Sequence, residues 1–181
     1  ASKIAQAIRA VTNEVEADLC GLSSTFSRAF GTAGTAPFGT ANDYTDASNV
    51  LRILKDNGAP LQDNQLVINT AAGVNLLGKQ AAVADAGSDS ILRQGVLLDI
   101  NGMPIRESAQ VVNHVAGGAN AAYTSSAAGF AAGSTVIALI TGAGTVLAGD
   151  VISFAGDTNK YVVASALAGG NVTIAAPGLK Q

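Results

Sequence analysis

Residues 4–31 read IAQAIRAVTNEVEADLCGLSSTFSRAFG and contain the clearest structural signal in the chain. Apolar residues recur there with a mean step of about 3.7 residues, close to the period of a straight α-helix. The apolar positions are Ile4, Ile8, Val11, Val15, Leu19, Leu22, Phe26 and Phe30. Ser2 can cap this helix and Gly31 can end it. We therefore predict a helix roughly 40 Å long, with its apolar face buried against a sheet or neighbouring subunits.

Shorter elements follow this helix. Residues 31–42 are small and turn-rich, which indicates a loop. A second helix is expected to begin at Asp43 or Thr45 and to end at Gly58 and Pro60. We then expect a buried strand and two short helices, at Gln65–Asn69, Thr70–Leu77 and Ser88–Gln94.

The pair Asn101-Gly102 separates two runs that contain apolar residues, Val96–Ile100 and Met103–Val111. Asn-Gly between such runs is a strong hairpin signal, because a type I′ turn needs positive φ at both central residues. The sequence therefore predicts a β-hairpin at this point.

The amino-acid composition changes after His114. Residues 116–133 are rich in Ala, Gly and Ser, which indicates a linker. Strand patterns follow at Thr135–Thr141, Val151–Phe154, Tyr161–Ala164 and Val172–Ala175.

These elements together predict an α+β fold in three parts. Residues 1–115 form a core that contains the long helix, residues 116–133 form the linker, and residues 134–181 form a small antiparallel β-domain. A sheet of so few strands is marginally stable alone, so we expect this β-domain to be incomplete.

The composition argues against several functional classes. Ten Lys and Arg residues stand against thirteen Asp and Glu residues, and the net charge of −3 comes with no basic stripe of the kind that binds nucleic acid. Aromatic residues make up only 4 % of the chain, unlike the lining of a ligand cavity. No apolar run approaches the roughly 20 residues that span a bilayer.

One stretch resembles a phosphate-binding loop. Gly73 to Lys79 has the G-x-x-x-x-G-K spacing and follows a predicted strand. The next residue is Gln80, where such a loop needs Ser or Thr to hold magnesium. Val and Leu inside the stretch suit a packed helix better, so nucleotide binding is the weaker interpretation. The Gly142-Ala143-Gly144 run fails as a dinucleotide fingerprint, because Leu147 replaces the third glycine.

The other reactive side chains each have an ordinary structural interpretation. His114 is the single histidine and is expected at the end of a hairpin strand, and Cys20 is the single cysteine, expected to be buried or at an interface. A lone cysteine also excludes an intrachain disulfide and suggests a reducing cytoplasm. The near-paired carboxylates fall at caps and turns: Asp43 and Asp46, Asp85 and Asp89, Asp150 and Asp157. A glycosylation sequon at Asn171 lies in a predicted strand. We therefore expect no catalytic, cofactor-binding or metal-binding residues.

The order of four stretches resembles the major capsid (coat) proteins of tailed bacteriophages, in particular those of short-tailed phages. Residues 4–31 resemble the spine helix of that family. The runs LKDNGAPLQDNQLVINTAAGVNLLG (54–78) and ILRQGVLLDINGMPIRESAQVV (91–112) resemble the segment that follows it and the hairpin that crosses the axial domain. The run from Gly133 to Val163, which ends in GDVISFAGDTNKYVV, resembles the entry to an inserted β-domain, with Gly149-Asp150 and the Phe154-Ala155-Gly156 turn as matching residues.

The resemblance implies a fold and a function. It implies the Hong Kong-type capsid fold, in which many copies form the pentamers and hexamers of an icosahedral head around DNA. The implied partners are other copies of the chain, a scaffolding protein and a portal, with DNA enclosed but not specifically bound and no membrane. The implied location is the virion. We also expect a trimmed piece of a coat protein, because the family's N-terminal arm, extended loop and return strands have no counterpart in residues 1–181.

Two alternatives stay open. A bacterial surface or secreted β-rich module would account for the Ala-, Gly- and Thr-rich second half, but not for the long capped helix. A nucleotide-binding protein built on Gly73–Lys79 is the other.

Overall fold

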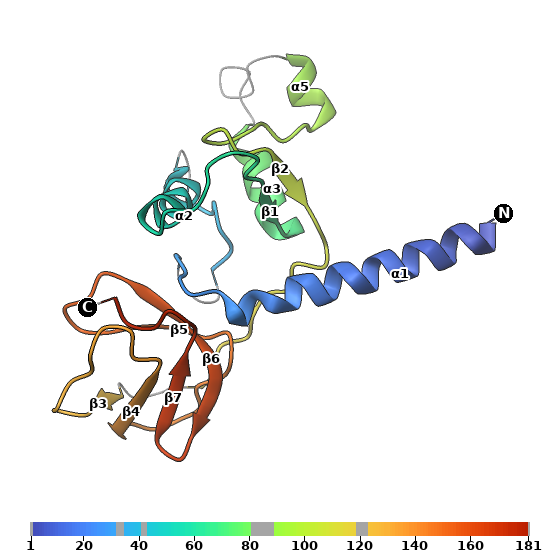
Figure 1. Cartoon of the computed structure of the whole chain (residues 1–181). Coiled ribbons are helices and arrows are strands. Elements are labelled where there is room, and N and C mark those ends of the chain that lie inside the picture. The colour runs from blue at the N-terminus through green and yellow to red at the C-terminus, as the bar shows by residue number, and fades with distance from the viewer. Residues whose placement is uncertain (1, 32–34, 41–42, 81–88, 119–122, 181) are drawn as a thin grey trace. The chain divides into compact units, whose positions relative to one another are not determined.

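A computed structural model describes residues 2–31, 35–40, 43–80, 89–118 and 123–180 (Figure 1). The chain is 31 % helical and 21 % strand, with its largest sheet antiparallel, which confirms the predicted α+β class. It divides into two compact units, each made from two separate stretches of chain. Unit 1 consists of Ala1–Cys20 and Thr35–Val112, and unit 2 consists of Gly21–Gly34 and Asn113–Gln181.

The first helix is shorter than the sequence pattern predicts. Helix α1 spans Ser2–Gly21, a short 3-10 turn η1 spans Leu22–Thr25, and the backbone is extended at Phe26. The prediction of a helix that continues to Gly31 is therefore wrong. Hydroxyl side chains after Gly21 compete for backbone groups, as shown by the Thr25 Oγ1 hydrogen bond to the Leu22 carbonyl at 2.6 Å. At 1.5 Å per residue α1 is roughly 30 Å long.

The apolar face of α1 is exposed in the single chain, so no sheet of this chain buries it, whereas burial against neighbouring subunits stays a prediction. Its five apolar positions are 54–68 % exposed, and no residue of α1 is buried. These positions are Ile4, Ile8, Val11, Val15 and Leu19. Nothing in the described part of the chain covers this face, which we call the α1 stripe.

The remaining elements of unit 1 follow the predicted order. They are α2 (Thr45–Asp56), β1 (Leu66–Ile68), α3 (Thr70–Lys79), α5 (Asp89–Gln94) and β2 (Ile105–Glu107). The Asn69 side chain caps α3 by accepting a hydrogen bond from the Ala72 amide at 2.9 Å. A small core joins the helices to the strands, and it consists of Phe38, Ala47, Ile68, Ala72, Leu76 and Met103.

The predicted hairpin is reduced to its turn. Asn101 and Gly102 have φ values of 53° and 75°, as a type I′ turn requires, and Ile100 pairs with Met103 across it. The strand that follows does not pair with residues 96–100. Instead β2 pairs in parallel with β1, with Leu66 opposite Ile105. The prediction of an extended hairpin is therefore wrong: antiparallel pairing stops at the Ile100–Met103 bridge, and β2 takes its ladder from β1, whose Ile68 is buried in the core of unit 1.

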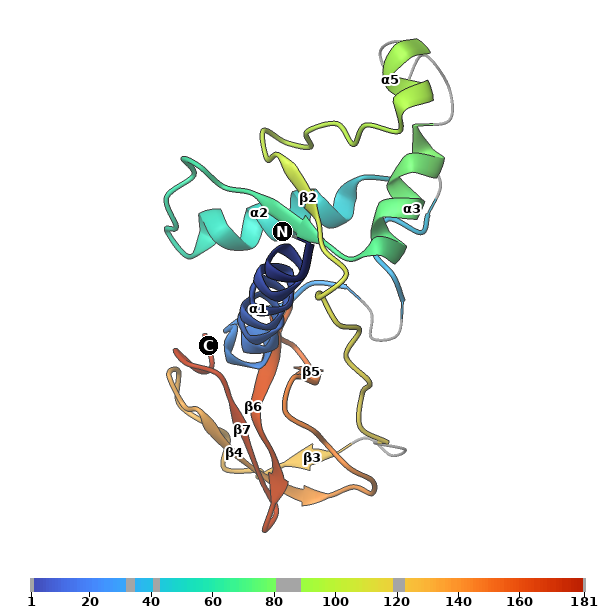
Figure 2. The same cartoon turned by 90° about the vertical axis from the view of Figure 1, so that its right-hand side faces the viewer.

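Unit 2 is built around a five-stranded sheet that forms an antiparallel half-barrel, and Figure 2 shows β4, β7 and β6 side by side. The strand order is β3-β4-β7-β6-β5. The bounds are β3 (Thr124–Ser125), β4 (Val136–Thr141), β5 (Val151–Ser153), β6 (Lys160–Ala168) and β7 (Asn171–Ile174). Four of these strands match the predicted ones. Strand β3 is additional and lies within residues 116–133, where the composition indicated a linker.

The core of unit 2 lies on one face of this sheet. Its fully buried side chains are Ile137, Tyr161, Val163, Val172 and Ile174. The N-terminal stretch of the unit joins the same sheet, since Arg28 forms an antiparallel bridge with Tyr161 and the Ala29 amide donates to the Lys160 carbonyl. Unit 2 is therefore completed by residues that precede unit 1's core in the chain.

Candidate functional site

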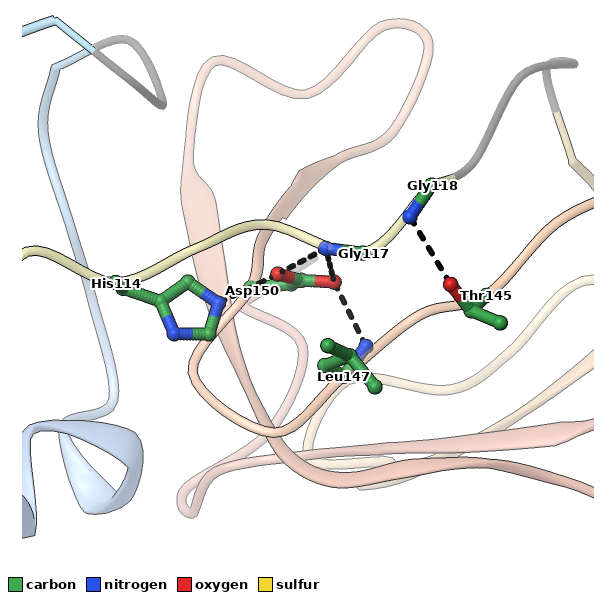
Figure 3. Close-up of polar contacts among 6 residues, drawn as sticks. All are labelled: His114, Gly117, Gly118, Thr145, Leu147 and Asp150. Carbon is green, nitrogen blue, oxygen red and sulfur yellow. Dashed lines mark hydrogen bonds and ion pairs between the residues drawn. The ribbon is translucent and has the colours of Figure 1, made fainter.

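A dense set of polar contacts in the described part of unit 2 surrounds the carboxylate of Asp150 (Figure 3). His114 Nε2 lies 2.6 Å from Asp150 Oδ1. The Gly117 amide donates to both carboxylate oxygens, at 3.1 and 3.2 Å, and the Leu147 amide donates to Oδ2 at 2.7 Å. We call this set of groups the carboxylate clamp. It joins the segment after His114 to the loop between β4 and β5.

The backbone around Asp150 is fixed by the sheet. The Asp150 carbonyl accepts a hydrogen bond from the Val163 amide at 2.8 Å, and the Gly149 amide donates to the Val163 carbonyl at 2.7 Å. Gly149 has a φ of +91°, and a Cβ at this position would lie 3.0 Å from His114 Nδ1. Glycine thus permits both the turn and the close approach of the imidazole.

A second contact holds the same two segments together. The Gly118 amide donates to Thr145 Oγ1 at 3.0 Å. A Cβ built on Gly117 would lie 2.2 Å from the Thr145 carbonyl oxygen, so only glycine fits there. Residues 114–118 therefore lie directly against the loop at 145–150.

The electrostatics of the clamp favour an ionised carboxylate. Burial raises the pKa of Asp150, but hydrogen bonds from the Leu147 amide, from His114 and from the Gly117 amide lower it by more. The net pKa of Asp150 lies below its ordinary value of 3.8. The Asp150 side chain is 11 % exposed, whereas that of His114 is 40 % exposed, so the imidazole reaches solvent.

An Asp–His pair can act as a general base if a nucleophile lies within hydrogen-bond reach of the second imidazole nitrogen. Here the imidazole edge that carries Nδ1 lies close to Gly149, where a Cβ would approach Nδ1 to 3.0 Å. The groups around the carboxylate in the described residues are backbone amides and the same imidazole. This geometry supports a structural tie between two segments.

The glycine-rich stretch at Gly73–Lys79 lies inside helix α3, where its amides are part of a regular helix. A Cβ on Gly73 would lie 2.9 Å from the Glu107 carboxylate, so an acidic group occupies the space beside it. Lys79 Nζ donates to the carbonyls of Thr40 and Asp43 and lies 5.1 Å from the Tyr44 ring centroid. These contacts engage the lysine within unit 1.

The Gly142-Ala143-Gly144 run packs against an aromatic ring. Tyr123 Oη donates to the Gly144 carbonyl at 2.8 Å, and a Cβ on Gly142 would lie 2.1 Å from Tyr123 Cδ1. The glycines at this turn therefore make room for Tyr123.

The other cysteine and aspartate residues named in the sequence analysis lie apart from the carboxylate clamp. Cys20 is a free, half-buried thiol near the end of α1. Asp43 and Asp46 form hydrogen bonds with the backbone amides of Thr45 and Phe38. Asp89 forms an exposed ion pair with Arg93 at 2.9 Å, and Asp85 lies outside the described residues. The sequon at Asn171 begins β7.

Asp150 and Asp157, which are close in sequence, belong to different clusters. Asp157 accepts a 2.5 Å hydrogen bond from Tyr161 Oη, and burial together with Asp157 raises the pKa of Tyr161. The pairing of His114 with Asp150 was not foreseen. The two residues are 36 positions apart, and the usable local signal is the Gly149-Asp150 pair before a strand.

Comparison with known proteins leaves the geometry as the main basis for a function. No protein-family model matches this chain, and no curated protein is similar to it in sequence. Among the described residues, no group of three or more His, Cys, Asp or Glu side chains could hold a metal ion. None of the described helices has the length and apolar character to cross a membrane.

Proposed function

We propose that this chain is a structural subunit of a virus head, the major capsid protein of a tailed bacteriophage or prophage. In this role it forms pentamers and hexamers of an icosahedral shell around DNA, and its location is the virion. The observation that carries the proposal is the α1 stripe, in which five large apolar side chains in one row are 54–68 % exposed. Such a surface on a soluble protein marks a place where other protein is bound.

The order of elements supports the finer fold assignment within this proposal. Helix α1 takes the place of the spine helix, and α2, α3, β1 and β2 take the place of the axial domain. The sheet of unit 2 takes the place of the inserted β-domain of short-tailed phage coat proteins. The supporting sequence features are those of residues 4–31, 54–78, 91–112 and 133–163.

The clamp and the small glycine contacts fit a shell protein. A shell subunit needs segments that hold their place while its surfaces meet several neighbours. The contacts of Asp150 and Gly117 hold residues 114–118 on the sheet through backbone amides. That function needs rigidity at a joint, and it needs no reactive group.

The charge of the chain fits enclosure of DNA without tight binding. The net charge is −3, and an acidic protein is repelled by the phosphate backbone. We expect no measurable binding of a labelled 30-base-pair duplex at roughly 100 mM salt in fluorescence anisotropy. Tight binding that weakens steeply with added salt would contradict this part of the proposal.

The direct test is negative-stain electron microscopy of the gene product that contains this chain, expressed with its neighbouring genes in bacteria. Those genes would supply the scaffolding protein and portal that the proposal implies as partners. Closed shells or rings of capsomers are the expected result. Monodisperse small particles would contradict the proposal and would favour a surface β-module, for which the five-stranded sheet of unit 2 is the supporting feature.

A further inference from the structure

We propose that the α1 stripe is the contact surface for α1 of a second copy of this chain, and that the two helices pack antiparallel. The inference rests on the proposed function, because both require copies of this chain to associate. It names the partner, the surface and the orientation of one contact.

The spacing of the stripe suits a long, nearly straight helix pair. Ile4 and Val15 are 11 residues apart, with Ile8 and Val11 between them at steps of four and three. An 11-residue repeat gives about 3.67 residues per turn, so the apolar row stays on one side of a regular helix. Two such rows can therefore remain in contact along the whole of α1.

The charges on α1 identify a second copy as the occupant. The basic residues Lys3 and Arg9 lie in the first half of the helix, and the acidic residues Glu14, Glu16 and Asp18 lie in the second half. An antiparallel pair places each basic half beside the acidic half of its partner. A parallel pair places like charges side by side, which is unfavourable. The helix is thus complementary to itself in one orientation.

The apolar residues set the register of this pair. If the two-fold axis passes between residues 11 and 12, Ile4 lies opposite Leu19 and Ile8 lies opposite Val15. The two copies of Val11 then face each other near the axis, about 1.5 Å apart along the helix direction. At 100° per residue, Arg9 and Glu16 flank the same edge of the stripe, so each can reach the other across the pair. The arrangement has the two-fold symmetry of a closed dimer contact.

The orientation is tested by cysteine crosslinking of the 181-residue chain in a Cys20→Ser background. A Val11→Cys variant should form a disulfide-linked dimer in most of the protein under mild oxidation, because the two α-carbons then lie within disulfide range. The matched control is Ile4→Cys, whose two copies would lie roughly 20 Å apart along the axis at 1.5 Å per residue. That control should stay monomeric on a non-reducing gel.

The charge pattern is tested by sedimentation equilibrium at low salt. Arg9→Glu and Glu16→Arg should each weaken the dimer by about three- to ten-fold in Kd, and the double variant should restore it. Asn13→Asp lies on the far side of the helix from the stripe and should leave Kd unchanged. Because these side chains are on α1, which has no buried residue, circular dichroism should show unaltered folding in all four variants.

Each outcome separates this inference from the proposed function. Equal crosslinking of Val11→Cys and Ile4→Cys would overturn the antiparallel orientation, and a monomer at all concentrations would overturn the pairing. Shells seen by microscopy without the Val11→Cys crosslink would leave the proposed function standing and remove the inference. The crosslink without shells would do the reverse.

Discussion

The guanidinium of Arg28 lies over the ring of Tyr161, with 4.6 Å between Arg28 Cζ and the ring centroid. The same guanidinium donates to the Gly178 carbonyl at 3.1 Å, and Tyr161 is fully buried. A cation over a desolvated aromatic ring is held by the ring quadrupole and by the apolar stem of the arginine. Arg28 therefore fastens the N-terminal stretch of unit 2 to the centre of its sheet.

Replacement of Arg28 by alanine should lower the free energy of unfolding by about 1–2 kcal/mol. The variant loses the cation–ring contact and the hydrogen bond to Gly178 together. Urea unfolding followed by circular dichroism measures the change, and Arg52→Ala at an exposed position of helix α2 is the matched control. A loss of equal size in both variants would show that Arg28 has no special role.

Replacement of Asp150 by asparagine should cost about 1–3 kcal/mol near neutral pH, because a buried amide replaces a carboxylate aimed at two N–H groups. The folded pKa of Asp150 is lowered, so its stabilising effect is complete above the ordinary value of 3.8 and is lost as pH falls through the folded pKa. The difference in stability between wild type and Asp150→Asn should therefore shrink below pH 3.8. Urea unfolding at a series of pH values checks this, with exposed Asp56→Asn as control. A difference that stays constant down to the most acidic samples would contradict the ionised clamp.

Two adjacent glycines should respond very differently to alanine. In Gly117→Ala the new Cβ would meet the Thr145 carbonyl oxygen at 2.2 Å, whereas in Gly118→Ala it would meet Thr145 Oγ1 at an ordinary 3.8 Å. We expect a loss of about 2–3 kcal/mol for the first variant and little change for the second. Thermal melts of both proteins give the comparison. Equal melting temperatures would mean that residues 114–118 do not lie against the loop at 145–150.

A β-branched residue in the Asn101-Gly102 turn should destabilise the chain, because the backbone there has a positive φ that such residues disfavour. Gly102 has a φ of +75° and open space where a Cβ would be, so Gly102→Val adds strain without a clash. The expected cost is about 1–2 kcal/mol. Gly21→Ala, also in open space but without positive φ, is the control and should not destabilise the chain. An unchanged melting temperature in Gly102→Val would argue against the type I′ turn.

Local chemistry made several elements predictable. The strand at Leu66–Ile68, the helix after Asn69 and the positive φ at Asn101 and Gly102 each follow from residues within a few positions of one another. The end of α1 did not follow, because apolar spacing continues through Leu22 and Phe26 after the helix has stopped. The apolar periodicity alone does not show how Gly21 and the three hydroxyl residues Ser23, Ser24 and Thr25 end the helix.

Local sequence patterns do not predict contacts between residues that are far apart in the chain. The parallel pairing of β1 with β2 and the bond between His114 and Asp150 depend on how distant stretches meet. The prediction of His114 at a strand end is wrong, because β2 ends at Glu107, and the carboxylate that His114 contacts lies 36 positions away, where no local cluster of carboxylates indicates it. A short strand such as β3, with two residues in an Ala- and Gly-rich stretch, has no pattern long enough to detect.

The two-part construction of unit 2 has a consequence for the order of events during synthesis. Lys160 Nζ donates a hydrogen bond to the Gly31 carbonyl, and these two residues are 129 positions apart. At 5–20 residues per second, a ribosome takes roughly 6–26 s to make the intervening chain. During that interval residues 21–31 have been synthesised but β6, the strand they pair with, has not. The residues of unit 1 can already fold around their own core in the same interval. Residues 21–31, with apolar side chains exposed during synthesis, are therefore the stretch where we expect a chaperone to bind the nascent chain.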